Sequence, residues 1–215
     1  MFTLHEHLED EIEVGGETYR LNLSFDTVLS FFDLMNDPHF LETDKIEIAF
    51  LMFVDTDSEF DFETKYRAVE AIVNTFILDE TEEADEEEPS DGEQPSGGGR
   101  KYYDLKKDAE FIFASFMQEY GIDLIEQQGK LRWEKFKALL IGLRDKTKFK
   151  EIIGIRTMKL PRGKGMEEER QRIKKLKKIY ALEKDQRTTE EELDAMFATL
   201  SGGKKNGNQN RREKT

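Results

Sequence analysis

Three histidines are the first residues in this sequence whose type suggests metal binding. His5 and His7 flank Glu6, and on a strand this spacing would point both imidazole rings to the same face. A zinc site needs at least a third protein ligand, and the remaining histidine, His39, is distant in the sequence. Surface histidines near a frayed terminus explain the pair better, so we predict no metal site.

A run of acidic residues has the alternation of a calcium-binding loop. Carboxylates occupy every second position from Asp55 to Glu63. Such a loop needs glycine at its sixth position and glutamate at its twelfth, but counting from Asp55 these positions hold Phe60 and Tyr66. An acidic turn that leads into a helix N-terminus explains the same residues.

Phosphate-binding and nucleophile motifs are also incomplete. The glycines before Arg100 follow an acidic run instead of a strand, and they lack the Gly-Lys-Ser/Thr ending of a phosphate loop. The sequence has no Gly-x-Ser-x-Gly elbow, and no serine or threonine has an obvious histidine partner nearby. We therefore predict no catalytic residue, no cofactor and no enzymatic activity. The chain is interpreted as a binding protein.

Charge is divided unevenly along the 215 residues. The net charge is −14, but residues 1–99 carry 28 acidic and 4 basic residues, a balance of −24, while residues 100–215 carry 19 and 29, a balance of +10. Such asymmetry is typical of proteins that bind a charged partner or associate with themselves. The absence of cysteine fits a reducing compartment. The start lacks a signal-peptide pattern, and the longest apolar run, residues 48–54, is too short to span a membrane.

The first half of the chain predicts one hairpin and three helices. Alternating residues on both sides of Gly15-Gly16 indicate a β-hairpin over residues 11–23. Ser24 or Asp26 is expected to cap a helix that Asn36-Asp37-Pro38 ends, and a capping box beginning at Asp44 is expected to start the second helix. Apolar residues at helical spacing predict a third helix over residues 62–77.

The second half begins after a linker. Residues 79–100 are acidic and rich in proline and glycine, which predicts disorder because they bury little apolar surface. A broad apolar stripe predicts a central helix over residues 105–120, ended by Gly121. Further helices are expected over residues 131–143 and after Thr147, its expected cap, and Pro161 closes the compact region.

Residues after Pro161 are the predicted partner-binding part. Residues 162–187 hold ten basic and five acidic residues, which predicts a solvated, extended basic helix with a thin apolar stripe. A last short amphipathic helix, at i, i+3, i+4, i+7 spacing, either packs back on the domain or docks on a partner. The apolar residues of the two helices are the candidate binding residues: Ile173, Leu176, Tyr180, Leu193, Met196, Phe197 and Leu200.

The predicted fold class is α+β and mostly α. We expect residues 1–161 to form a single helical domain, with a small N-terminal β-hairpin, interrupted by the disordered linker 79–100. Residues 162–200 should add the basic helix and the short amphipathic helix, and residues 201–215 a disordered tail.

Five segments resemble a known family, the phage gene product fifteen family of siphophages and prophages of Gram-positive bacteria. The resemblance covers roughly residues 1–161. The segments are 107–116 (KDAEFIFASF), 120–124 (YGIDL), 131–140 (LRWEKFKALL), 147–153 (TKFKEII) and 155–158 (IRTM). The acidic linker and the basic C-terminal extension are less typical of that family.

The resemblance implies a function through gene position. Family members are usually encoded between the major tail protein and the tape measure protein, where tail assembly chaperones are typical. It therefore implies a non-catalytic chaperone in the host bacterial cytoplasm, with the tape measure protein and the tail-tube protein as partners. Alternatives are a minor structural component of the tail, or a nucleic-acid-binding or regulatory protein that uses the basic extension. The three glutamates that open the basic helix argue against nucleic acid.

Overall fold

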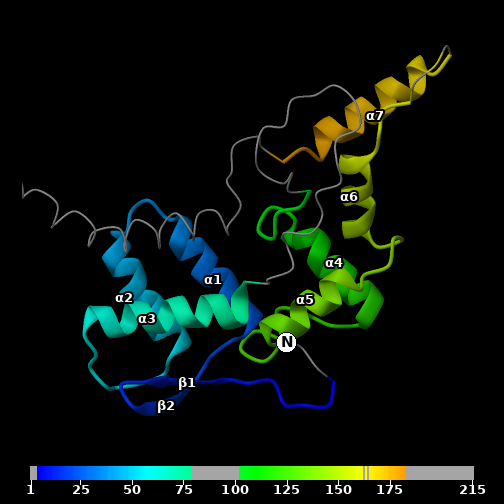
Figure 1. The fold of residues 1–215 in the computed structure, drawn as a ribbon. Helices are drawn as coiled ribbons and strands as arrows, with labels where there is room; N and C mark the ends of the chain where they lie inside the picture. The colour runs from blue at the N-terminus through cyan, green and yellow to red at the C-terminus, as the bar shows by residue number, and fades with distance from the viewer. Residues whose placement is uncertain (1–3, 79–101, 162, 164, 183–215) are drawn as a thin grey trace, which may run out of the picture. The chain divides into compact units, whose positions relative to one another are not determined.

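The protein is mainly helical with one small β-hairpin (Figure 1). The computed structural model describes residues 4–78, 102–161, 163 and 165–182. The predicted fold class is confirmed for these residues. The predicted linker 79–100, the short helix with Leu193 to Leu200 and the tail 201–215 lie outside them. The elements are β1 (Glu11–Val14), β2 (Glu17–Arg20), α1 (Phe25–Asn36), α2 (Glu42–Phe53), α3 (Phe62–Ile72), η1 (Val73–Ile77), α4 (Ala109–Tyr120), α5 (Trp133–Ile141), α6 (Lys148–Thr157) and α7 (Glu167–Ile179).

Two compact units divide the described residues, and they differ in charge. The acidic unit comprises residues 4–22 and 30–78, and the basic unit comprises residues 23–29 and the described residues from 102 to 182. The acidic unit has 17 acidic and 4 basic residues, a balance of −13; the basic unit has 13 and 18, a balance of +5. The predicted asymmetry therefore persists between the two units. That residues 1–161 form one domain stays a prediction.

The hairpin forms where the alternation predicted it. Val14 pairs with Glu17, which leaves Gly15 and Gly16 as a two-residue loop. Both glycines have positive φ, +62° and +86°, the backbone region that such loops require and that glycine adopts without strain. Just after β2, the Asn22 N–H donates a hydrogen bond of 2.8 Å to the carbonyl of Phe53, the last residue of α2.

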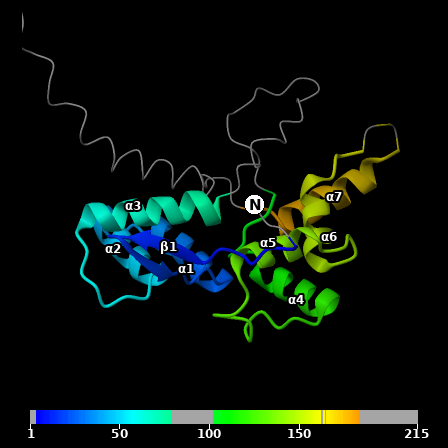
Figure 2. The ribbon, with the colours of Figure 1, turned by 60° about the horizontal axis from the view of Figure 1, so that its bottom comes forward.

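The core of the acidic unit is built largely from α2 and α3, which pack together (Figure 2). Ile46, Phe50 and Phe53 on α2 are fully buried, as is Phe31 of α1, whose ring centre lies 5.1 Å from that of Phe53. The predicted helix over residues 62–77 forms as α3 followed directly by η1, a π-helical turn that the spacing did not indicate. Phe31, Phe50 and Phe53 are the largest fully buried side chains of this core.

The predicted capping box at Asp44 is wrong. Helix α2 begins at Glu42, with Leu41 at the N-cap and no side-chain cap. The helix starts earlier because Glu42 and Asp44 then both lie in its first turn, where negative charge is favourable. Lys45 is buried one turn further on, and its ammonium donates to Glu42 Oε1 (3.0 Å) and to the Met35 carbonyl near the end of α1 (2.8 Å).

The basic unit incorporates residues from the N-terminal part of the chain. Phe25 N–H donates to the Leu131 carbonyl at 2.9 Å, and Trp133 N–H donates to the Leu23 carbonyl at 2.8 Å. Asp26 Oδ1 accepts the N–H of Gly129, also at 2.9 Å. The Phe136 ring continues the contact, because it stacks with three other rings at centre distances of 5.0 to 5.6 Å: Phe25, Phe116 and Trp133. Residues 23–29 therefore complete the core formed by α4 and α5.

Helix α6 begins at the predicted residue but is capped by another. Thr147 occupies the N-cap position, yet its hydroxyl donates to the Arg144 carbonyl at 2.7 Å. The buried Ser115 of α4 accepts the N–H of Phe149 at 3.0 Å and donates to the Phe111 carbonyl at 2.6 Å. Ser115 thus satisfies one of the free N–H groups at the start of α6 from a different helix.

We expect Ser115→Ala to destabilise the basic unit by about 1–3 kcal/mol, because it leaves the buried Phe149 N–H without an acceptor. The measurement is urea denaturation followed by circular dichroism. Thr147→Ala is the matched control. Its loss should cost less, about 1 kcal/mol or below, since the Arg144 carbonyl still accepts the N–H of residue 147. A larger effect at Thr147 than at Ser115 would contradict this assignment.

Candidate functional site

The residues that the sequence suggested for metal chemistry have other roles in the structure. His39 Nδ1 lies 2.7 Å from Asp37 Oδ1, and His5 pairs with Glu6; both pairs are at the surface. The backbone N–H of His39 also donates to Asp37, which lowers the pKa of that carboxyl. Among the described residues, no group of three or more His, Cys, Asp or Glu side chains is placed to hold a metal ion.

The acidic run before α3 forms the beginning of a helix, as predicted. Asp61 is the N-cap residue of α3, and its carboxylate accepts the N–H of Thr64 at 2.7 Å. This hydrogen bond lowers the pKa of Asp61, because it stabilises the ionised carboxylate. Capping is a structural role and implies no ligand.

The predicted partner-binding residues divide into described and undescribed positions. Leu193, Met196, Phe197 and Leu200 lie outside the described residues. On α7, Ile173 is buried, and Leu176 and Tyr180 are half-buried, because this stripe packs toward α6 (Figure 2). The interpretation of α7 as a solvated, extended helix is therefore correct only for its outer face. Ile173, Leu176 and Tyr180 hold the helix on its own unit.

Arg156 of α6 fixes α7 and the chain before α4 in place. Its guanidinium forms a bidentate ion pair with Asp108, with distances of 2.6 Å from Nη1 to Oδ2 and 2.7 Å from Nη2 to Oδ1. Nη1 also donates to the Tyr102 carbonyl (3.0 Å), and Nε donates to the Tyr180 carbonyl at the end of α7 (2.6 Å). Only 1% of the Asp108 side chain and 10% of the Arg156 side chain are exposed. We call these contacts the Arg156 network.

Further contacts hold the C-terminal end of α7. Lys177 Nζ donates to the Arg156 carbonyl at 2.9 Å. The Tyr180 ring packs edge-on against Phe111 of α4, with ring centres 6.2 Å apart, and the Lys148 ammonium lies 5.5 Å from its centre. A hydrogen bond to Glu151 raises the pKa of Lys148. Helix α7 is therefore anchored by its apolar stripe and by polar contacts at its end.

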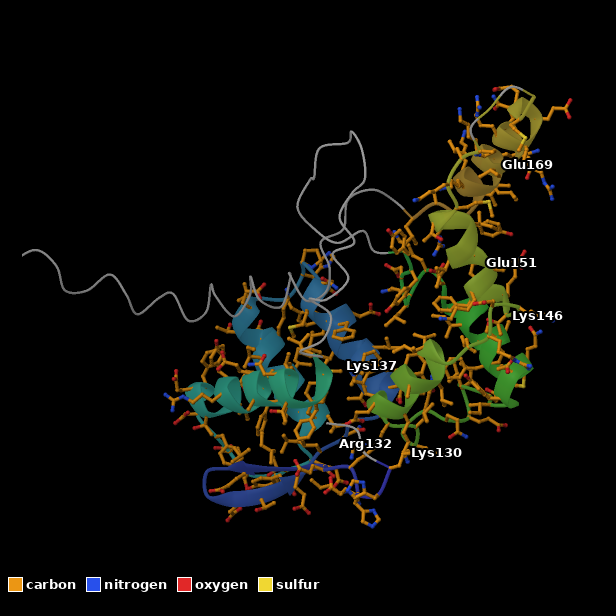
Figure 3. All side chains as sticks on the ribbon, turned by 45° about the vertical axis from the view of Figure 1, so that its right-hand side comes forward. Lys130, Arg132, Lys137, Lys146, Glu151 and Glu169 are labelled. Carbon is orange, nitrogen blue, oxygen red and sulfur yellow. The ribbon has the colours of Figure 1, made fainter. Side chains whose placement is uncertain are left out.

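The outer face of α7 is the candidate interaction surface. It carries four exposed basic side chains, Arg172, Lys174, Lys175 and Lys178, and the exposed Ile179. Exposed glutamates occupy the first turn of the helix, among them Glu169, labelled in Figure 3. The same view labels Lys146 beside α6 and Glu151 on that helix. Charge on α7 thus changes from acidic to basic along the helix, as the helix dipole favours.

The sequence indicated the charge of this surface but not the contacts that anchor α7 to its unit. The lysines of α7 were visible as a basic run, whereas nothing in the spacing of Asp108 and Arg156 predicted that they pair. They are 48 residues apart, and only the packing of α4 on α6 brings them together. The signal in the sequence was that Arg156 stands at helical spacing from Phe149 and Ile152, where a charged residue on an apolar stripe suggests a polar partner.

The family model described as Bacteriophage Gp15 protein matches residues 4–182. Neither the curated proteins nor the solved structures include a match to this chain. Within the described residues, every helix is too short or too polar to cross a membrane.

We expect Arg156→Lys to release α7. Lysine keeps the charge but cannot reach Asp108 and the Tyr102 and Tyr180 carbonyls together, and weakening a buried ion pair costs up to about 3–5 kcal/mol. Hydrogen exchange of the α7 amides should accelerate, and the urea midpoint should fall. The control is Arg172→Lys. The exposed Arg172 has its Nη1 atom 3.8 Å from Glu169 Oε2, and this substitution should change the free energy of unfolding by no more than about 0.5 kcal/mol. Unchanged exchange in α7 would contradict the anchoring role.

We expect Asp61→Asn to change how stability depends on pH. The pKa of Asp61 is lowered in the folded state. The stability that its ionised carboxylate contributes is therefore fully present above pH 3.8, the ordinary pKa, and is lost as the pH falls through the lowered pKa. Asparagine still accepts the Thr64 N–H but does not titrate. Urea midpoints measured from about pH 6 to about pH 3 should therefore fall less for the variant than for the wild type. Parallel profiles would be the contrary result.

Proposed function

The chain belongs to the bacteriophage Gp15 protein family, and from this premise we propose that it is a non-catalytic tail assembly chaperone. In this proposal it binds the tape measure protein and helps to recruit tail-tube subunits in the host bacterial cytoplasm. The observation that carries the proposal is the family match over residues 4–182. The gene position that the resemblance implies, beside the tape measure protein, supplies the expected partner.

The outer face of α7 supports a binding role. Four basic side chains are exposed on a helix whose opposite face is anchored by the Arg156 network. A surface held in this way loses little conformational freedom when a partner binds. A tape measure protein is long and helical, so many copies of one weak contact along it would add up to stable coverage.

Nucleic-acid binding is the second candidate function, and the exposed lysines of α7 are the observation in its favour. Lys174, Lys175 and Lys178 could each neutralise a phosphate. Phosphate contacts make affinity fall steeply with salt, so a DNA titration at several salt concentrations tests this function. A third candidate, a minor structural component of the tail, is tested by mass spectrometry of purified virions, because a chaperone should be absent from them.

We expect co-expression with the tape measure protein to give a soluble complex that this chain purifies. The variant Lys174→Glu/Lys175→Glu/Lys178→Glu should reduce capture by about tenfold, since each exposed charge contributes up to about 1 kcal/mol. A variant with serine at the four apolar positions Leu193, Met196, Phe197 and Leu200 tests the amphipathic segment in the same assay.

The matched control reverses three other exposed lysines of the same unit, Lys135, Lys146 and Lys159. It makes the same change in net charge but leaves α7 unchanged, and because capture is proposed to depend on α7, capture should stay within about twofold of the wild type. Equal losses in both triple variants would indicate an effect of net charge alone. If the tape measure protein is equally soluble without this chain and does not bind it, the chaperone proposal is wrong.

A further inference from the structure

Helix α2 carries apolar side chains on its outer face as well as on its core face. Ile46, Ala49, Phe50 and Phe53 are fully buried against the acidic unit. On the other side, Leu41 and Leu51 are 69% and 62% exposed, and Ile48 and Met52 are half-buried. The outer stripe follows helical spacing, because residues 41, 44, 48, 51 and 52 lie on one side of the helix. We call Leu41, Ile48, Leu51 and Met52 the α2 stripe.

Isolated exposed apolar residues are common on protein surfaces and need no explanation. The α2 stripe differs because it extends over three turns of one helix. Helix α3 of the same unit shows the ordinary pattern, with an exposed ion pair between Arg67 and Glu63 at 2.9 Å on its outer face. On α2, by contrast, two leucines that are more than half exposed lie on the same side of the helix as Ile48 and Met52, although Asp44 also lies there. The stripe is therefore a surface that a partner would cover.

The charges around the stripe restrict the partner. Asp44 lies within it, Asp55 follows its end, and the acidic unit has a balance of −13. A two-fold contact between α2 helices would place Asp44 and Asp55 of two copies together, and the like charges would oppose it. The apolar segment at Leu193 to Leu200 is also poorly matched, because Glu190, Glu191, Glu192 and Asp194 accompany it.

We propose that the α2 stripe binds an amphipathic helix of another protein, whose apolar face is flanked by lysine or arginine. Apolar side chains of that helix would cover Leu41, Ile48, Leu51 and Met52, and its basic flanks would pair with Asp44 and Asp55. This mode of binding needs no groove beyond the exposed stripe. The proposal deepens the proposed function, on which it depends only for the suggestion that the helix belongs to the tape measure protein.

The first test uses a synthetic peptide and the full-length protein. The peptide has roughly 20 residues, with leucine at i, i+3, i+4 and i+7 and lysine beside them, and a second version replaces lysine with glutamate. We expect the lysine peptide to bind and Leu41→Ser/Leu51→Ser to weaken it at least about tenfold, by fluorescence anisotropy. Ile125→Ser/Ile141→Ser removes two equally exposed apolar residues of the basic unit and should change binding less than about twofold.

A charge exchange separates loss of binding from loss of folding. Asp44→Lys/Asp55→Lys leaves the apolar stripe intact, so it should weaken the lysine peptide by about tenfold and strengthen the glutamate peptide by a similar factor. An unfolded variant could not gain affinity for the second peptide. If the leucine variant and the isoleucine control bind the lysine peptide equally well, or if charge exchange changes neither affinity, the proposal is overturned.

The remaining occupants of the stripe are outcomes that also overturn it. Dimers of the wild type that Leu41→Ser/Leu51→Ser converts to monomers would show that a second copy covers the stripe. A gain of about tenfold in peptide affinity when Leu193, Met196, Phe197 and Leu200 are replaced with serine would show that the chain covers it itself. Capture of the tape measure protein distinguishes the two proposals. If the wild type and Leu41→Ser/Leu51→Ser capture it equally well, only the proposal for the α2 stripe is contradicted. If the wild type does not capture it, only the chaperone function is contradicted.

Discussion

The buried ion pair between Arg156 and Asp108 holds the basic unit in its observed arrangement. Two charges in an apolar interior are costly, and here the cost is offset by four hydrogen bonds that the guanidinium donates. The acceptors come from three segments: the chain before α4, the start of α4 and the end of α7. The Arg156 side chain thus helps to fix the position of α7, and with it the positions of the lysines on the outer face of that helix.

A second constraint is the crossing of the chain between units. Residues 23–29 contribute the first half of α1 and the ring of Phe25 to the basic unit, while the rest of that helix belongs to the acidic unit. The core of the basic unit is therefore incomplete without residues from the first half of the sequence. Phenylalanine suits both cores, because a large apolar ring fills a small interior with few side chains and stacks with its neighbours. The buried Ser115 and Lys45 are accommodated because their polar side-chain atoms bond to backbone groups near helix ends.

The two units present different outer surfaces, and this difference matters for the proposed chaperone function. Helix α7 is charged on its outer face, whereas the outer face of α2 carries an apolar stripe in which Asp44 also lies. A charged face speeds the encounter with an oppositely charged partner, and salt weakens this attraction. An apolar stripe supplies affinity mainly through the apolar surface that it buries on binding. Several modest contacts of both kinds would let the protein cover a long helical partner and later leave it, which a single tight interface would not permit.

Local rules in the sequence predicted the elements, because turn residues and apolar spacing act over a few positions. Gly15 and Gly16 determined the hairpin loop, Gly121 the left-handed end of α4, and the acidic run the start of α3 at Asp61. The charge asymmetry was also evident from the counts of acidic and basic residues in the two halves of the sequence. Only the tertiary structure decided that Ser115 and not the Thr147 hydroxyl caps α6, that α7 is anchored, and that Arg156 meets Asp108. These contacts join residues 21 to 48 positions apart, and pairing over such separations follows from how helices pack, which no local pattern encodes.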